Sequence, residues 1–238
     1  MKDYWVLMGS FGSGKSELAI NMALQARKSG PCTLVDLDVI NAYFRSSERA
    51  ADLEAAGVEL ISPPFAMDKI EILALSPRVY SVFTPGDGTV IFDIGGDDIG
   101  TVALGQYKPN FANIPPERLH VLFIVNPLRP MAANVPSALA VLGNLQIAGR
   151  MEVTGIVNNG NLAGMTDVSH LVMGYDLVKG LSEQTGIPVW GTVGTQNVLD
   201  EFRQYAQEHD LDDAYIGRYQ PIEVMMHRSW DKYLSEGL

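Results

Sequence analysis

An apolar run that leads directly into a glycine-rich loop is the feature that most limits what this chain can fold into. The run spans residues 4–8, and the next eight residues read Gly-Ser-Phe-Gly-Ser-Gly-Lys-Ser, which fits the pattern G-x-x-x-x-G-K-[ST]. A buried strand that ends in such a loop and continues into a helix directs backbone N–H groups and the positive helix end at one small volume. The pattern therefore predicts a phosphate-binding loop at the edge of an α/β sheet.

Each residue type in this loop has a predicted part in binding a nucleoside triphosphate. The three glycines allow backbone conformations and close approaches that a side chain would block. Lys15 can reach the β- and γ-phosphates, and the Ser16 hydroxyl can ligate Mg²⁺. A chance match in a glycine-rich turn is the alternative, but it would not explain the strand before the loop and the helix after it. The loop residues predicted to contact the nucleotide are Gly9, Ser10, Phe11, Gly12, Ser13, Gly14, Lys15 and Ser16.

The composition excludes several classes of function. With 238 residues, of which 47% are hydrophobic, the chain is long enough to bury a large core within one α/β domain. The formal net charge of −11 opposes general attraction to nucleic acid or to an anionic membrane surface. Cys32 is the only cysteine, which argues against a disulfide or a four-thiolate iron–sulfur site within one chain.

Neither the N-terminus nor the longest uncharged stretch looks like a membrane segment. The N-terminus lacks a basic, apolar, cleavable leader, which predicts a cytoplasmic protein. Residues 130–149 carry no charge, but two prolines, two asparagines and a glutamine make them too polar to span a bilayer. Their leucines recur at helical spacing, so we expect a helix packed on a sheet and no transmembrane segment.

Short apolar runs alternate with helical patterns along the chain, which is typical of a mainly parallel sheet with helices on both faces. The runs lack the alternation of a strand with one solvent-facing side, so the strands should be buried. No linker or repeat interrupts this order, and we expect residues 1–238 to form one domain. The predicted strands are 4–8, 33–37, 58–61, 89–94, 119–125, 152–157 and 187–192. The predicted helices are 15–28, 46–56, 68–81, 131–148, 167–184, 196–207 and a C-terminal one at 221–235.

In such a sheet the residues that follow the strands meet at one edge and form the ligand site. Asp36 and Asp38 follow the second predicted strand, where they could hold a metal-bound phosphate or orient an attacking water. Asp93 ends the fourth strand three residues before Gly96, which is the spacing in which the carboxylate holds Mg²⁺ and the glycine N–H contacts the γ-phosphate. Acidic turns or helix caps are the simpler alternative, since aspartate favours both.

The loop after the sixth strand bears on the choice of base. Asn158 and Asn159 stand at this strand end and could read a base edge with their amides. The first downstream aspartate is Asp167, so the loop lacks the carboxylate that guanine-specific loops use, and adenine is favoured. The residues after the seventh strand, 193–197, are small and polar enough to wrap the base or the ribose.

The order of these motifs resembles the MinD/ParA/CobQ-CobB superfamily of P-loop ATPases, which includes nitrogenase iron protein and dethiobiotin synthetase. The similarity runs from the loop through VDLD, VIFDIGG and VNN to IPVWGTV, over residues 4–205. It implies a P-loop NTPase fold with a sheet of about seven strands, ATP with Mg²⁺ as ligands, and a nucleotide-dependent homodimer. It also implies that Lys15 and Asp38 act in catalysis, that Ser16, Asp38 and Asp93 serve the metal, and that Asn158 or Asn159 reads adenine.

One position departs from the superfamily pattern. Its dimerising branches carry a second lysine directly after the first glycine of the loop, which reaches the partner's nucleotide, and here that position is Ser10. An arginine could supply the missing charge to the transferred phosphoryl group, and Arg45 is the best placed by sequence. The alternative, which we favour, is that Arg45 and Arg49 form ion pairs on a helix with Glu48 or Asp52.

Two main functions fit these residues. The first is a regulatory ATPase in which hydrolysis switches loops 38–50 and 95–110 between conformations that a protein partner reads. The second is an ATP-dependent kinase or ligase similar to dethiobiotin synthetase, in which a small-molecule nucleophile replaces the water. Ser10 favours the second, or a nucleotide-binding module with negligible turnover. The glycine- and aspartate-rich segment after Asp93 favours the switch, which we take as the leading hypothesis.

Overall fold

Eight parallel strands form one sheet in the order β3-β2-β4-β1-β5-β6-β7-β8. The computed structural model describes residues 1–38, 46–62, 77–96 and 98–226, with only the backbone of Pro77, Asp98 and Ile99. β1 lies between β4 and β5 in the middle of the sheet, and most residues of these three strands are buried. The strands are β1 (Lys2–Met8), β2 (Cys32–Leu37), β3 (Glu59–Ile61), β4 (Gly88–Ile94), β5 (Leu119–Val125), β6 (Gly155–Asn158), β7 (Val189–Gly194) and β8 (Arg218–Pro221).

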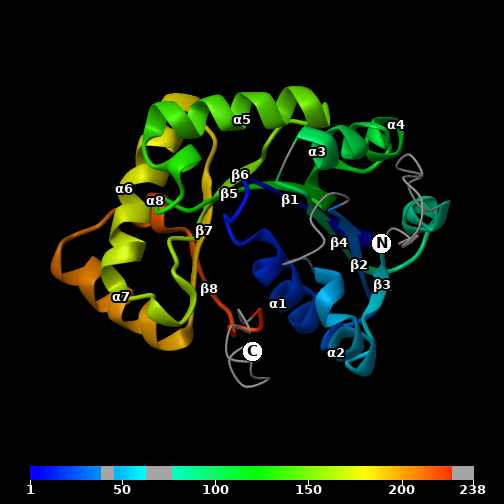
Figure 1. The fold of residues 1–238 in the computed structure, drawn as a ribbon, viewed down its shortest axis with the longest axis horizontal. Coiled ribbons are helices and arrows are strands. Elements are labelled where there is room, and N and C mark those ends of the chain that lie inside the picture. Colours follow the sequence, from blue (N-terminus) through cyan, green and yellow to red (C-terminus); the bar gives the residue numbers. More distant parts are fainter. Residues whose placement is uncertain (39–45, 63–76, 97, 227–238) are drawn as a thin grey trace, which may run out of the picture.

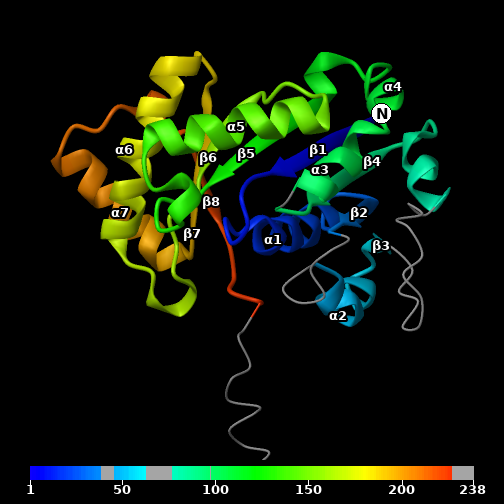
Figure 2. The ribbon, with the colours of Figure 1, turned by 45° about the horizontal axis from the view of Figure 1, so that its top comes forward.

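Helices cover both faces of this sheet (Figures 1 and 2). α1 and α2 pack on one face of β1–β4, and α3, α4 and α5 lie on the other, while α6, α7 and α8 gather around β6, β7 and β8. Two apolar clusters fill the space between sheet and helices, one on each face. The helices are α1 (Lys15–Arg27), α2 (Ala50–Ala55), α3 (Asp98–Gly105), α4 (Lys108–Phe111), α5 (Val135–Gly149), α6 (Val168–Thr185), α7 (Gln196–Glu208) and α8 (Asp213–Ile216), with 3₁₀ turns at Ser46–Arg49, Pro77–Phe83, Pro116–Arg118, Pro130–Ala132 and Ala163–Met165.

Local sequence signals set the ends of the longer helices. Asp167 caps α6 by accepting from the Ser169 N–H, and Gly186 ends the helix at a left-handed φ of 72°. Asn134 caps α5 in the same way through the Ser137 N–H, with Pro136 in the first turn. Such caps pair backbone groups that a helix end would otherwise leave without partners.

The structure confirms the predicted fold class and extends the sheet by one strand. β8 replaces the start of the predicted helix at 221–235, and residues 222–226 have no regular secondary structure. The rest of that helix, and most of the helix predicted at 68–81, lie outside the described residues. The segment 95–110, predicted to be a switch loop, contains α3 and the start of α4, so the prediction of a loop was wrong for most of this segment.

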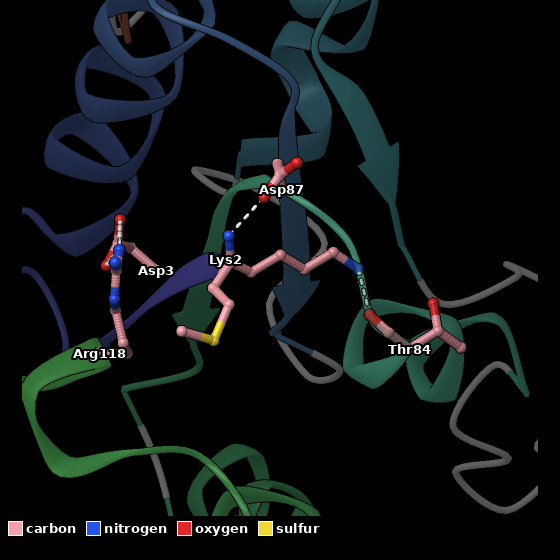
Figure 3. Close-up of polar contacts among 6 residues, drawn as sticks. Lys2, Asp3, Thr84, Asp87 and Arg118 are labelled. Carbon is pink, nitrogen blue, oxygen red and sulfur yellow. Dashed lines mark hydrogen bonds and ion pairs between the residues drawn. The ribbon is translucent and has the colours of Figure 1, made fainter.

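Ion pairs and hydrogen bonds stabilise the amino ends of the central strands, which lie opposite the glycine-rich loop (Figure 3). Arg118, just before β5, donates to both oxygens of Asp3 at 2.9 and 3.1 Å. Lys2 donates to the carbonyl of Thr84 at 2.9 Å, and the N-terminal amine pairs with Asp87. Within the described part of the chain, no helix is long and apolar enough to cross a membrane.

Candidate functional site

The loop between β1 and α1 wraps around the side chain of its own lysine. Lys15 Nζ donates to the carbonyl oxygens of Gly9 and Ser10 at 3.0 Å each, and the side chain is only 6% exposed. Gly14 precedes α1 at φ 89°, a left-handed conformation that favours glycine. The positive end of α1 and the lysine ammonium therefore converge on one volume, which favours an anion there.

Asn159 braces this loop from the end of β6. Its Nδ2 donates to the Ser13 carbonyl at 2.7 Å, and the side chain is 1% exposed. A Cβ at Gly14 would lie 2.2 Å from the same nitrogen, so a glycine is required here by both its dihedral angle and its neighbour. The amide predicted to read a base thus holds the phosphate-binding loop in place.

Asn158, the neighbouring candidate for reading the base, points away from the loop into the protein. It is fully buried, donates to the Leu171 carbonyl at 2.9 Å, and accepts from the Gly160 N–H at 3.2 Å. A Cβ at Gly174 of α6 would lie 1.8 Å from Asn158 Oδ1, so the amide fills a space under that helix. The structure does not bring this side chain to the site.

Asp93 lies at the floor of the site, and neither of its carboxylate oxygens has a hydrogen-bond partner among the residues that the structure describes. Burial raises its pKa to about 7, and the neighbouring Asp36 carboxylate adds to the increase. The Ser16 and Ser46 hydroxyls and the Lys15 ammonium lie close enough to lower that pKa, although neither hydroxyl donates a hydrogen bond of ordinary geometry to the Asp93 carboxylate. A buried acceptor without a partner is costly, and it is commonly completed by a ligand.

Asp36 lies near the end of β2 and Asp38 directly follows this strand, and the two residues have different roles. Asp36 pairs with Asp93 in register and accepts from the backbone N–H groups of Asp38 and Ser47 at 2.9 and 3.1 Å. Burial raises its pKa, while these hydrogen bonds lower it. Asp36 therefore fixes the backbone at Asp38, which is the residue that sequence reasoning placed in catalysis.

The two glycines after β4 fit between the phosphate-binding loop and Asp38. A Cβ at Gly96 would lie 2.7 Å from the Phe11 backbone nitrogen and 3.1 Å from Lys15 Nζ. A Cβ at Gly95 would lie 3.3 Å from Asp38 Oδ1. The structure thus brings together the predicted loop residues, Gly96, Asp93 and Asp38 at the carboxyl edge of the sheet.

The polar atoms around the loop fit a magnesium–nucleotide ligand. Carboxylate and hydroxyl oxygens are the ligands that Mg²⁺ takes from proteins, and Asp93 and Ser16 supply them side by side. Several further buried polar atoms at the site have no hydrogen-bond partner in the ranges that the structure describes. They are Ser13 Oγ, Ser46 Oγ and Asn159 Oδ1.

Two side chains at the site were not assigned to it from the sequence. Ser46 falls at a predicted helix start, and no pattern distinguishes it from a cap. Arg129 lies four residues after the end of β5, and a search of the residues that follow each strand could have found it as a candidate. Its Nε donates to the Gly12 carbonyl at 2.8 Å. Arg45, considered from the sequence as a mobile positive charge, lies outside the described residues, whereas Arg49 pairs with Asp52 at 2.8 Å as expected.

Comparisons with known proteins support the fold. The cell division protein FtsY of Thermotoga maritima superposes with a TM-score of 0.54 at 18% identity, over 81% of this chain and 61% of that one. The signal recognition particle receptor FtsY of Elizabethkingia anophelis in complex with GDP (TM-score 0.51, 18% identity, 81% and 57%) and chloroplast FtsY of Physcomitrella patens (0.51, 15%, 81% and 58%) give similar matches. A scan against protein-family models and a search of curated sequences gave no match. The chain thus has a P-loop NTPase fold and spans about three fifths of these neighbours.

Proposed function

We propose that this chain binds ATP with Mg²⁺ and hydrolyses it as a nucleotide-dependent switch for a protein partner. The observation that carries the proposal is the buried Asp93 carboxylate, which accepts no hydrogen bond of ordinary geometry from the described residues and lies beside Ser16 and Lys15 at the phosphate-binding loop. A bound magnesium–phosphate group would supply a cation for this carboxylate and anionic oxygens for the Lys15 ammonium.

The chain's own groups would divide the work of hydrolysis. Lys15 would leave the Gly9 and Ser10 carbonyls to bind phosphate oxygens, and the loop N–H groups would stabilise the charge that develops there. Asp38, held at the end of β2, would accept a hydrogen bond from the attacking water and orient it toward the γ-phosphate. Ser16 and Asp93 would hold Mg²⁺, which neutralises phosphate charge when bound.

The switch would act through the segment that follows β4. Gly95 and Gly96 lie between Asp38 and the loop, and α3 begins two residues later. α3 borders a groove of about 290 Å³ with α5, where Val102 and Ile147 are 53% and 78% exposed. A ligand that displaces Gly96 would therefore shift a helix with exposed apolar side chains, which a protein partner could read.

Phosphate release from ATP and Mg²⁺ over a wide range of protein concentration tests the proposal. We expect turnover in the wild type and its loss in Lys15→Ala, with the fold retained by circular dichroism. Unchanged ATP affinity in Lys15→Ala would refute the site. If ATP binds without phosphate release, a kinase or ligase with a small-molecule acceptor takes precedence over the switch.

Competition between GTP and ATP in the same experiment tests which base the site prefers. The site lacks a loop aspartate after β6, which favours adenine, whereas one neighbouring structure holds GDP. We expect ATP to bind more tightly than GTP, and the reverse order would assign the chain to guanine nucleotides.

A further inference from the structure

Arg129 is held against the phosphate-binding loop by the turn that leaves β5. Asn126 Oδ1 accepts from the Leu128 N–H at 3.0 Å, and the Asn126 carbonyl accepts from the Arg129 N–H at 3.1 Å. Asn126 is fully buried, and its Nδ2 donates to the Asn161 carbonyl at 3.0 Å. This asparagine turn therefore fixes the backbone from which the arginine side chain extends.

The guanidinium of Arg129 lies on the loop itself. Its Nε donates to the Gly12 carbonyl at 2.8 Å, and a Cβ at Gly12 would lie 3.1 Å from Nε and 3.5 Å from Cζ. Gly12 adopts φ 72° and follows Phe11, whose backbone touches Gly96. The arginine thus lies at the end of the loop where the γ-phosphate is expected.

The charge of Arg129 has no carboxylate partner among the residues that the structure describes. Its hydrogen bond to Gly12 uses one of five N–H donors, so both Nη groups remain for a ligand. Four other arginines of the described chain pair with carboxylates at 2.7–3.2 Å; they are Arg49, Arg78, Arg118 and Arg203. In a chain of net charge −11, a guanidinium that has no carboxylate partner among the described residues and lies on the loop between β1 and α1 favours an anionic ligand.

We propose that Arg129 binds the β/γ end of the nucleotide's phosphate chain, with its Nη groups donating to phosphate oxygens while Nε stays on Gly12. This inference rests on the proposed nucleotide site. A planar guanidinium suits two oxygens of one phosphate chain, and its fixed backbone limits the entropy lost on binding. Arg129 would then supply from within the chain a positive charge at the transferred phosphoryl group.

The test compares ATP and ADP affinities, by titration with Mg²⁺, in variants that separate charge from loop bracing. Arg129→Gln removes the charge and keeps an amide donor, while Arg129→Lys keeps the charge. The matched control is Arg118→Gln, which removes an arginine at the other end of β5 and loses one ion pair. Thermal unfolding of each variant confirms that the fold is retained.

We expect Arg129→Gln to weaken ATP binding by about tenfold or more and ADP binding much less, because one charge-assisted contact to the γ-phosphate is lost. Arg129→Lys should restore most of the preference for ATP, and Arg118→Gln should bind both nucleotides as the wild type does. Equal losses for ATP and ADP, or equal effects of Gln and Lys, would refute the inference and assign Arg129 to bracing. If Lys15→Ala loses ATP and Arg129→Gln does not, the nucleotide site stands and the inference fails; if the wild type binds neither ATP nor GTP, both fail.

Discussion

Replacing Asp93 by asparagine should stabilise the nucleotide-free protein while removing its magnesium ligand. Asp93 is 1% exposed, its carboxylate accepts no hydrogen bond of ordinary geometry from the described residues, and the Asp36 carboxylate lies beside it, so its ionised form is unfavourable in the folded protein. Asparagine has nearly the same shape without the charge, and its amide can pair with the nearby Ser16 or Ser46 hydroxyl. The site therefore trades stability for ligand binding, as functional sites often do.

The size of this effect follows from the pKa of Asp93. Its rise from 3.8 to about 7 corresponds to at most about 4 kcal/mol, since each unit is worth about 1.4 kcal/mol. Because the folded-state pKa is raised, the folded protein binds more protons than the unfolded chain between these values. The wild type should therefore be most stable below pH 4 with respect to this group and lose that stability as the pH rises to about 7.

Urea unfolding in EDTA at several pH values from 4 to 8 measures the prediction. We expect Asp93→Asn to match the wild type near pH 4 and to exceed it by about 2–4 kcal/mol above pH 7. Asp176→Asn, at an exposed position of α6, removes the same charge and should stay within about 0.5 kcal/mol of the wild type. A destabilised Asp93→Asn at pH 8, or a difference that does not vary with pH, would refute the reasoning.

Three further substitutions test how the loop and the C-terminal segment are held. Gly14→Ala should abolish nucleotide binding and lower the free energy of unfolding by at least about 1–2 kcal/mol, because a Cβ there would lie 2.2 Å from Asn159 Nδ2 and the residue has φ 89°. A melting temperature equal to that of the wild type would contradict this prediction. Asn159→Ala should weaken ATP binding and lower the free energy of unfolding by about 1–3 kcal/mol, because the Ser13 carbonyl loses the amide that donates to it at 2.7 Å. An unchanged affinity in an ATP titration would show that Asn159 does not support the site. Glu17→Gln should weaken the attachment of residues 225–226, because the backbone N–H groups of both residues donate to the Glu17 carboxylate. Hydrogen exchange at these two amides should accelerate, and unchanged protection would show that other contacts hold the segment.

The sequence predicted the fold where the pattern was local and strong. Seven strands read as continuous apolar runs because both faces of the parallel sheet are covered, and all seven are present within a few residues of their predicted bounds. β8 was missed because its four residues, Arg218–Pro221, include two long polar side chains and lie at an edge of the sheet. α3 was taken for loop because glycines flank and interrupt it, and only the packing of Leu104 into the core shows why a helix forms there.

For the site as well, the sequence predicted the residues that belong to a local pattern and missed the others. The loop motif and Asp93 could be found from the sequence because each has a fixed spacing after an apolar strand. The choice between Asn158 and Asn159 could not, because adjacent residues at a strand end point to opposite sides, and only the structure shows that Asn159 meets Ser13 while Asn158 lies under α6. The contact of Arg129 with Gly12 joins residues 117 apart, and no local pattern reports it.

The two charged groups at the centre of the site have complementary needs in the absence of ligand. Lys15 donates to two carbonyl oxygens of its own loop, and the Asp93 carboxylate accepts no hydrogen bond of ordinary geometry within the described part of the chain. A ligand that brings anionic oxygens and a divalent cation satisfies both groups in one event, so its binding energy includes relief of the unpaired carboxylate. Gly96 lies against Phe11 and beside Lys15, so a ligand that draws Lys15 away from its loop carbonyls would change the packing around Gly96, two residues before α3. This shared packing, more than any single residue, is the physical basis for proposing that occupancy of the phosphate site is transmitted to the helix surface.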